Sequence, residues 1–194
     1  MSYATLAELK AYLKIPTATT TEDTLLQTFL DEADDIIDEI VGVPSAAAAL
    51  TTRVFLDPPL DGLILSFGRA DVCVGITAVV NGDGAAIAAT DYVTLPLGEL
   101  PIYGLQLKAS SNLSWNTTAG ISVTAYWANT TNANGTVDAL IRGAALQLAT
   151  WLYRSKDNVT ELTRPTRTDD GYTVLPLALP KAILDRLQLR RGLI

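Results

Sequence analysis

The sequence predicts an α+β protein in which a small helical core carries an antiparallel β insertion and an extended C-terminal tail with a short helix. Three observations predict this class. Apolar residues recur at helical spacing in two long segments, about 22–41 and 137–154. Between them, short segments rich in Val, Ile, Thr and Tyr alternate with turn residues. Hydrophobic residues make up 48% of the 194-residue chain, which is ample material for a packed core.

The first expected helix is short. Thr5-Leu6-Ala7-Glu8 matches a capping box, in which Thr5 accepts from a free backbone N–H and Glu8 reaches back to Thr5. Leu6, Leu9 and Leu13 then give the helix one apolar side. Pro16 ends it, because proline removes a backbone donor and clashes with the preceding turn.

A longer acidic helix is expected over Glu22–Val41. Its acidic start suits the positive end of the helix dipole. Gly42 followed by Pro44 is a typical stop signal. The alanine-rich segment Ser45–Leu50 either extends this helix or serves as a connector, and a connector is the favoured interpretation.

The middle of the chain predicts antiparallel strands. Asn81-Gly82, directly after an apolar run, is the preferred chemistry of a tight hairpin turn because both residues tolerate positive φ. The strands are expected at Arg53–Leu56, Ile64–Phe67, Val72–Val80, Tyr92–Leu95, Leu105–Ala109 and Ile121–Ala128.

A second amphipathic helix, Val137–Arg154, follows, with Arg154 at its negative pole. Ser155–Asp170 is polar and expected to be exposed, Tyr172–Leu175 is expected to be extended, and Pro180 introduces a last helix, Lys181–Arg191. The expected domains are a helical core over 1–50 and 136–156, a β insertion over 51–135, and a C-terminal arm with a docking helix over 157–194.

The charge distribution disfavours one large class of function. The formal net charge is −7, whereas proteins that hold nucleic acid by neutralising phosphates carry basic patches. Residues 1–50 hold two basic and nine acidic side chains (net −7), residues 51–150 four and seven (net −3), and residues 151–194 eight and five (net +3). An acidic front and a basic tail suit contacts between copies, although solvated faces that merely differ in charge explain the pattern as well.

Reactive and metal-binding residue types are scarce. The chain has no His and one Cys, which excludes an internal disulfide and a Cys/His metal site. Cys73 stands between two valines and is expected to be a small buried hydrophobe. No signal peptide is visible, and the longest charge-free apolar run, Val72–Val80, is too short to span a bilayer, so no membrane contact is expected.

The acidic helix carries the one cluster of side chains that could take part in a chemical reaction. Its carboxylates lie three or four residues apart, a spacing that places them along one helical side and would suit a Mg²⁺-dependent nucleotide hydrolase. A second acidic helix should then face the first, and Val137–Arg154 offers only Asp138. A solvated face, a channel lining or a subunit interface is therefore favoured, and no catalytic residue, metal or cofactor is predicted. The candidate residues are Asp31, Asp34, Asp35, Asp38 and Glu39.

Two further surfaces are weighed. Trp115 or Trp127 would suit a glycan-binding module on a virion surface, although tryptophan is more often largely buried. The tail offers more apolar surface than a terminal helix needs, rimmed by arginines, and is expected either to dock on a partner or to pack on its own core. The candidate docking residues are Leu177, Leu179, Ile183, Leu184, Leu187, Arg186, Arg190 and Arg191.

Several strings, in this order, resemble the head–tail connector (adaptor) proteins of tailed bacteriophages. They touch most of the chain: residues 3–13 (YATLAELKAYL), Asp23-Thr24-Leu25-Leu26 with the later Ala33, Ile37 and Asp38, Val79–Gly84 (VVNGDG), Asp91-Tyr92, Val123–Trp127 (VTAYW), Ala149–Arg154 (ATWLYR), and the Pro-led helix of Pro180–Arg191. The run of carboxylates at Asp34-Asp35 and Asp38-Glu39 departs from the family pattern, and the β insertion is larger than in its smallest members.

The resemblance implies a structural protein without bond chemistry. It implies a dodecameric ring in the virion neck, made in the bacterial host cytoplasm, that stacks below the portal protein and extends the DNA channel for genome ejection. A stopper or tail-completion protein would follow it, double-stranded DNA would pass without specific binding, and the C-terminal segment would reach the portal.

Overall fold

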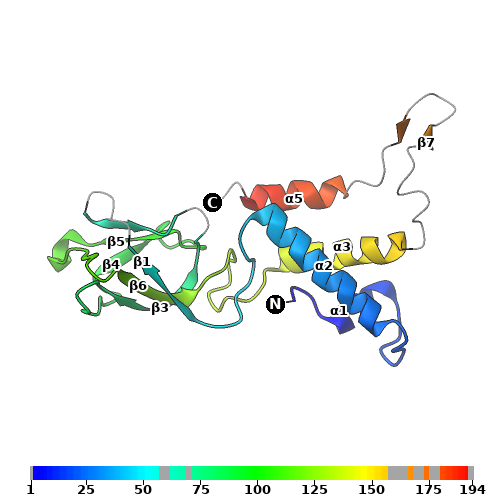
Figure 1. The fold of residues 1–194 in the computed structure, drawn as a ribbon, viewed down its shortest axis with the longest axis horizontal. Coiled ribbons are helices and arrows are strands. Elements are labelled where there is room, and N and C mark those ends of the chain that lie inside the picture. The colour runs from blue at the N-terminus through cyan, green and yellow to red at the C-terminus, as the bar shows by residue number, and fades with distance from the viewer. Residues whose placement is uncertain are drawn as a thin grey trace. The chain divides into compact units, whose positions relative to one another are not determined.

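The structure is a computed structural model that describes residues 2–56, 62–68, 71–156, 166–167, 173–174 and 180–191. The chain divides into two compact units, each treated below by itself. The helical unit comprises Ser2–Val41 and Ala139–Leu193, and the β unit comprises Gly42–Asp138. The β insertion expected from the sequence, 51–135, begins nine residues later and ends three residues earlier than the β unit, and the expected C-terminal arm is grouped with the helical unit. The α+β class predicted from the sequence is confirmed (Figure 1).

The helical unit begins with α1, Leu6–Leu13, whose predicted capping box is present. The backbone N–H of Glu8 donates to Thr5 Oγ1 at 3.2 Å, and the Thr5 N–H donates to Glu8 Oε2 at 2.8 Å. The Glu8 carboxylate accepts from both the Thr5 N–H and the Thr5 hydroxyl, the latter at 2.9 Å, and these two bonds hold the pKa of Glu8 below its usual value. The helix ends where Lys14 takes the left-handed conformation, just before Pro16.

The two long helices, α2 (Asp23–Val41) and α3 (Ala139–Ser155), pack against each other. Gly42, at φ +86°, follows α2 as the predicted stop signal requires. α3 begins two residues later than predicted because the Asp138 carboxylate accepts from the Thr131 N–H and hydroxyl, which ties it to the preceding loop. Five apolar residues of α2 at helical spacing are buried, Leu26, Leu30, Ala33, Ile37 and Val41, whereas Leu25 is 39% exposed.

The last helix, α5 (Lys181–Arg191), contacts both α2 and α3 in the helical unit (Figure 1). Ile183 and Leu187 are buried there. A short antiparallel pair, β7 (Thr166–Arg167) with β8 (Thr173–Val174), precedes it. The predictions for Ser155–Asp170 and Tyr172–Leu175 otherwise lie mostly outside the described residues.

The β unit contains two antiparallel three-stranded sheets. One has the order β1-β6-β3 and the other the order β2-β5-β4. The strands expected from the sequence all form, and no strand end is shifted by more than two residues. Their bounds are β1 Thr51–Phe55, β2 Ile64–Ser66, β3 Val74–Val80, β4 Tyr92–Leu95, β5 Gly104–Leu107 and β6 Ile121–Tyr126. β5 ends early because the chain turns into the 3₁₀ segment η1, Ala109–Ser111.

Residues of both sheets form one apolar core. β6 shows the strand period of two: Ile121, Val123 and Ala125 are fully buried, and the residues between them are half-exposed. The predicted connector Ser45–Leu50 contains no helix. Cys73 is fully buried as predicted, and burial raises the pKa of its thiol to about 12.

The Asn81 turn corrects one detail of the sequence analysis. Neither Asn81 nor Gly82 has positive φ; the left-handed residue is Gly84, at φ +86°, as in a three-residue hairpin loop. Gly82 is needed for another reason, since its N–H donates to the Asn116 carbonyl at 2.8 Å and an added Cβ would lie 2.2 Å from that oxygen. The buried Asn81 side chain holds the same loop, donating to Ser114 O at 3.0 Å.

Candidate partner-binding surfaces

The candidate acidic residues of α2 do not share one environment. Asp34 is buried, and its Oδ2 accepts from the Tyr3 backbone N–H at 3.0 Å. Asp38 accepts from the Tyr3 hydroxyl. Burial raises the pKa of Asp34 to about 6, against the opposing effect of hydrogen bonds from Tyr3 and Ser2. Asp34 and Asp38 therefore fix the N-terminal segment onto α2.

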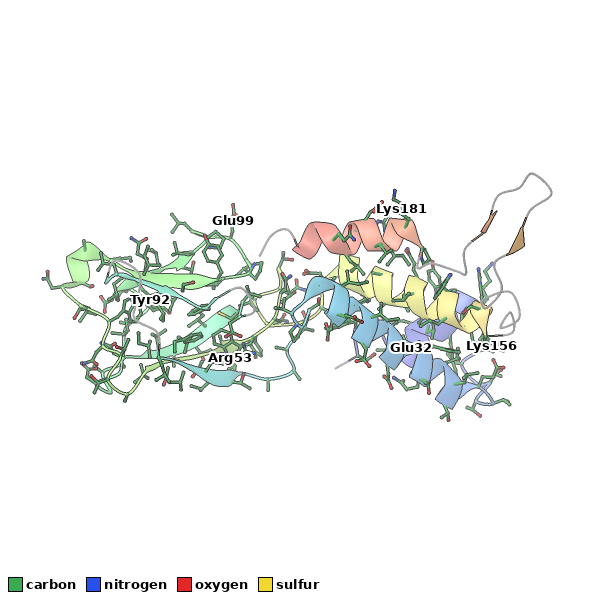
Figure 2. All side chains as sticks on the ribbon, turned by 45° about the horizontal axis from the view of Figure 1, so that its top comes forward. Glu32, Arg53, Tyr92, Glu99, Lys156 and Lys181 are labelled. Atoms are coloured by element: carbon green, nitrogen blue, oxygen red, sulfur yellow. The ribbon has the colours of Figure 1, made fainter. Side chains whose placement is uncertain are left out.

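The other acidic residues face solvent. Asp31, Glu32, Asp35 and Glu39 are exposed, and we call these four residues the acidic stripe; Figure 2 labels Glu32 on α2. Glu32 was not among the candidate residues selected from the sequence. In the part of the chain that the structure describes, no Lys or Arg forms an ion pair with any of the four. The stripe is an anionic surface on the side of α2 opposite its buried residues, and within it Asp31 accepts from the Gln27 amide at 2.9 Å.

The basic side chains of the helical unit differ in their burial and in the contacts that they make. Lys10 is buried, forms an ion pair with Asp23, and donates to Thr19 O at 2.8 Å. Lys156, labelled in Figure 2, lies 4.9 Å from the centre of the Tyr153 ring. Arg154 is exposed and makes no hydrogen bond or ion pair with any described residue.

The described residues do not assemble the groups that the hydrolase alternative needs. None of their His, Cys, Asp and Glu side chains form a cluster of three or more able to hold a metal ion. Within this part of the chain, α2 thus supplies carboxylates without a second acidic element facing them. No helix of the described residues is long and apolar enough to cross a membrane.

The two tryptophans considered for glycan binding are buried in the β unit. Trp115 is 9% exposed and its Nε1–H donates to Leu63 O at 2.7 Å. Trp127 is 5% exposed, donates to Thr51 O at 2.9 Å, and is covered by the Arg53 guanidinium 4.6 Å from its ring centre. Neither ring presents an exposed face on which a sugar could stack, so these two residues do not support the glycan-binding alternative.

The candidate docking residues of the tail have separate positions. Ile183 and Leu187 pack inside the helical unit, Leu184 is half-buried and Arg186 is exposed. Leu177 and Leu179 lie outside the described residues, as do the side chains of Arg190 and Arg191. α5 therefore covers its own core with one side and leaves Arg186 on the other.

Sequence reasoning missed a surface between α1 and α3. A pocket of about 290 Å³ is lined there by Tyr12, Gln147, Thr150, Trp151 and Arg154, and we call it the α1–α3 pocket. Trp151 is only half-buried. The available signal was the spacing of Gln147, Trp151 and Arg154, which places these three side chains on one face of α3.

The overall fold can be compared with those of known proteins. No family model and no curated protein sequence matches the chain. Solved structures do. A chain in the neck of the empty gene transfer agent (GTA) particle, computed with C6 symmetry, matches with a TM-score of 0.56 and 14% identity over 97% of this chain and 89% of that chain.

Two related structures agree with this match. A chain in the virion of the native GTA particle has a TM-score of 0.54 and 16% identity over 96% of this chain and 89% of its own. A chain in the neck of the native GTA particle, computed with C12 symmetry, has a TM-score of 0.52 and 13% identity over 94% and 87%. The protein therefore has a fold found in the neck of gene transfer agent particles, which confirms the resemblance inferred from the sequence at the level of the fold.

Proposed function

We propose that the protein is a structural subunit of the virion neck of a tailed phage or phage-like particle, a head–tail connector (adaptor). Its copies form a ring beneath the portal, join the capsid to the tail and extend the DNA channel. The observation that carries this proposal is the fold shared with neck chains over 94% to 97% of the protein. A match over nearly the whole chain includes the β insertion as well as the helices.

A ring of identical subunits is part of the proposal. The two neck structures were computed with C6 and C12 symmetry, which supports a cyclic assembly and is compatible with twelve copies. The portal on one side and a stopper or tail-completion protein on the other are the proposed partners. The function is mechanical and uses no cofactor, so purified protein with Mg²⁺ should not turn over nucleotides.

The exposed carboxylates of α2 have two roles compatible with a ring. Facing the channel, they would repel phosphate and let the duplex pass without sticking, whereas Lys or Arg would bind it. Facing a neighbouring copy, they would meet its cations. Asp34 and Asp38 take no direct part in either role, because they hold Tyr3.

Portal docking is proposed for the outer side of α5 and the arm before it. Arg186, Arg190 and Arg191 would form the basic rim, with Leu177, Leu179 and Leu184 as apolar contacts. Ile183 and Leu187 would support the helix from inside, because both are buried in the helical unit. Arginine at the rim of an amphipathic helix is typical of such docking surfaces.

Mass photometry of the protein alone, and then mixed with the portal protein of the same particle, tests the proposal. We expect a complex whose mass equals the portal ring plus a whole ring of this chain. Arg186→Glu should weaken it, whereas Lys14→Glu, the same charge change on exposed residue Lys14 just after α1, should not. Deleting residues 176–194 removes two buried side chains, so its effect on folding must be checked by circular dichroism. If no complex forms with the folded wild-type chain, the connector function is wrong.

A further inference from the structure

We propose that the α1–α3 pocket of one copy binds the acidic stripe of the next copy, so that pocket and stripe are the two halves of the subunit contact. This inference rests on the proposed function, which requires a ring, and it identifies the surfaces that close the ring. It also chooses between the two roles left open for the exposed carboxylates of α2.

The pocket has the donors that a carboxylate requires. Arg154 supplies a guanidinium without a partner among the described residues, and Tyr12, 50% exposed, supplies a phenolic hydroxyl. Gln147 adds an amide. A carboxylate only accepts hydrogen bonds, and its bonds to guanidinium groups are roughly twice as strong as neutral ones. The rings of Tyr12 and Trp151 also provide apolar surface for the stems of glutamates.

A buried polar group in the pocket wall lacks a partner. Thr150 is 6% exposed, and its hydroxyl makes no hydrogen bond with any described residue. A helical Thr can ordinarily bond the carbonyl one turn earlier, and buried hydroxyls are seldom left unsatisfied. A small shift of this wall on docking would give the hydroxyl a carboxylate acceptor, which marks the pocket as a site that is incomplete in a single copy.

The same face of α3 has further features that the single chain does not explain. Leu140 is 47% exposed, and one turn later Gly143 stands inside the helix. A Cβ added at Gly143 would meet nothing within 4 Å, so this glycine has no packing role in its own subunit. Interior glycine is unfavourable for a helix, and a close approach by another chain is a physical reason to keep it.

The positions of the two surfaces point to a second copy as the occupant. α2 and α3 pack against each other, and the acidic stripe and the pocket face lie on their outward sides. A contact between two different surfaces of the same molecule is head-to-tail, and such contacts generate rings when the rotation closes. The stripe is anionic and unpaired, while the pocket offers Arg154, so the charges are complementary between copies.

Charge exchange tests this contact directly. The stripe variant carries Glu32→Lys with Asp35→Lys, and the pocket variant carries Arg154→Glu. Each alone opposes like charges at the contact, and we expect its self-association to weaken about tenfold or more. In an equimolar mixture, the lysines of one variant meet the glutamate of the other at one contact, and the native pair remains at the next. Mixing should therefore restore oligomers of wild-type mass, in alternating order.

Sedimentation velocity at matched concentrations measures these masses, and circular dichroism verifies that each variant is folded. Gly143→Leu, which has open space in its own subunit, should also reduce association, whereas Lys14→Glu should leave it unchanged. Folded variants that associate like wild type, or a mixture that fails to recover, overturn the contact. A wild-type chain that stays monomeric both alone and with the portal overturns it as well.

The outcomes separate this contact from the function on which it rests. Oligomers that follow the charge exchange without any portal binding would support the contact and refute the connector function. Portal-bound rings that form equally well from the stripe variant, the pocket variant and wild type would support the connector function and refute the contact.

Discussion

Asp34→Asn replaces one oxygen of a buried carboxylate by an amide nitrogen. The structure gives the size and the pH range of its effect on the free energy of unfolding. The buried carboxylate accepts from the Tyr3 N–H through Oδ2, and its Oδ1 makes no hydrogen bond with a described residue. Asn keeps the acceptor and the shape but removes the charge. The variant should therefore be more stable than the wild type wherever Asp34 is ionised.

The magnitude follows from the pKa of Asp34, which burial raises from 3.8 to about 6. The folded state thus holds the proton more tightly than the unfolded state does. Wild-type stability contributed by this group is greatest below the unfolded pKa of 3.8 and is lost as pH rises to about 6. Each pKa unit corresponds to about 1.36 kcal/mol, so the loss is at most about 3 kcal/mol.

Urea unfolding followed by helical circular dichroism, from pH 3.5 to 7.5 in steps of about 0.5, measures the difference between Asn and wild type. We expect it to be near zero at the acidic end and to reach about 2 to 3 kcal/mol in favour of Asn above pH 6.5. Glu8, whose lowered pKa has the opposite effect, is common to both chains and cancels. Asp35→Asn controls for removing a charge from the solvent side of the same helix. A difference that does not vary with pH would refute the reasoning.

Three further predictions concern stability and reactivity. Gly82→Ala should destabilise the β unit by about 2 kcal/mol because its Cβ would lie 2.2 Å from Asn116 O. Gly143→Ala has open space at its Cβ and should stabilise α3 by about 0.5 to 1 kcal/mol. Thermal melts compare the two variants, and equal changes in stability would contradict the geometry. Lys10→Met should cost about 2 kcal/mol in urea unfolding, since Asp23 and the carbonyls of Thr17 and Thr19 lose their donor; an unchanged midpoint would show that these contacts contribute nothing. Cys73, with its thiol pKa raised to about 12 by burial, should react with a disulfide reagent at pH 8 only when denaturant is present, and rapid labelling of the native chain would show that the thiol is accessible.

Local sequence patterns predicted most of the secondary structure. The capping box at Thr5–Glu8 and the Gly42 stop act through neighbouring residues, so their outcome is visible in the sequence. The apolar periods of α2 and β6 likewise predicted which sides are buried. The start of α3 escaped prediction because the Asp138 side chain bonds a loop seven residues earlier.

The candidate functional surfaces also have some features that the sequence predicts and others that depend on tertiary contacts. Composition alone indicated an acidic front and excluded a Cys/His metal site. Which carboxylates are free was decided by Tyr3, whose N–H and hydroxyl reach Asp34 and Asp38 across more than thirty residues of sequence. The α1–α3 pocket arises only when Tyr12 is brought beside α3, and Trp115 and Trp127 were assigned to the core only by sheet packing. Short-range patterns determine the elements because backbone hydrogen bonds and capping are local, whereas exposure and pairing of side chains depend on which distant segments cover them.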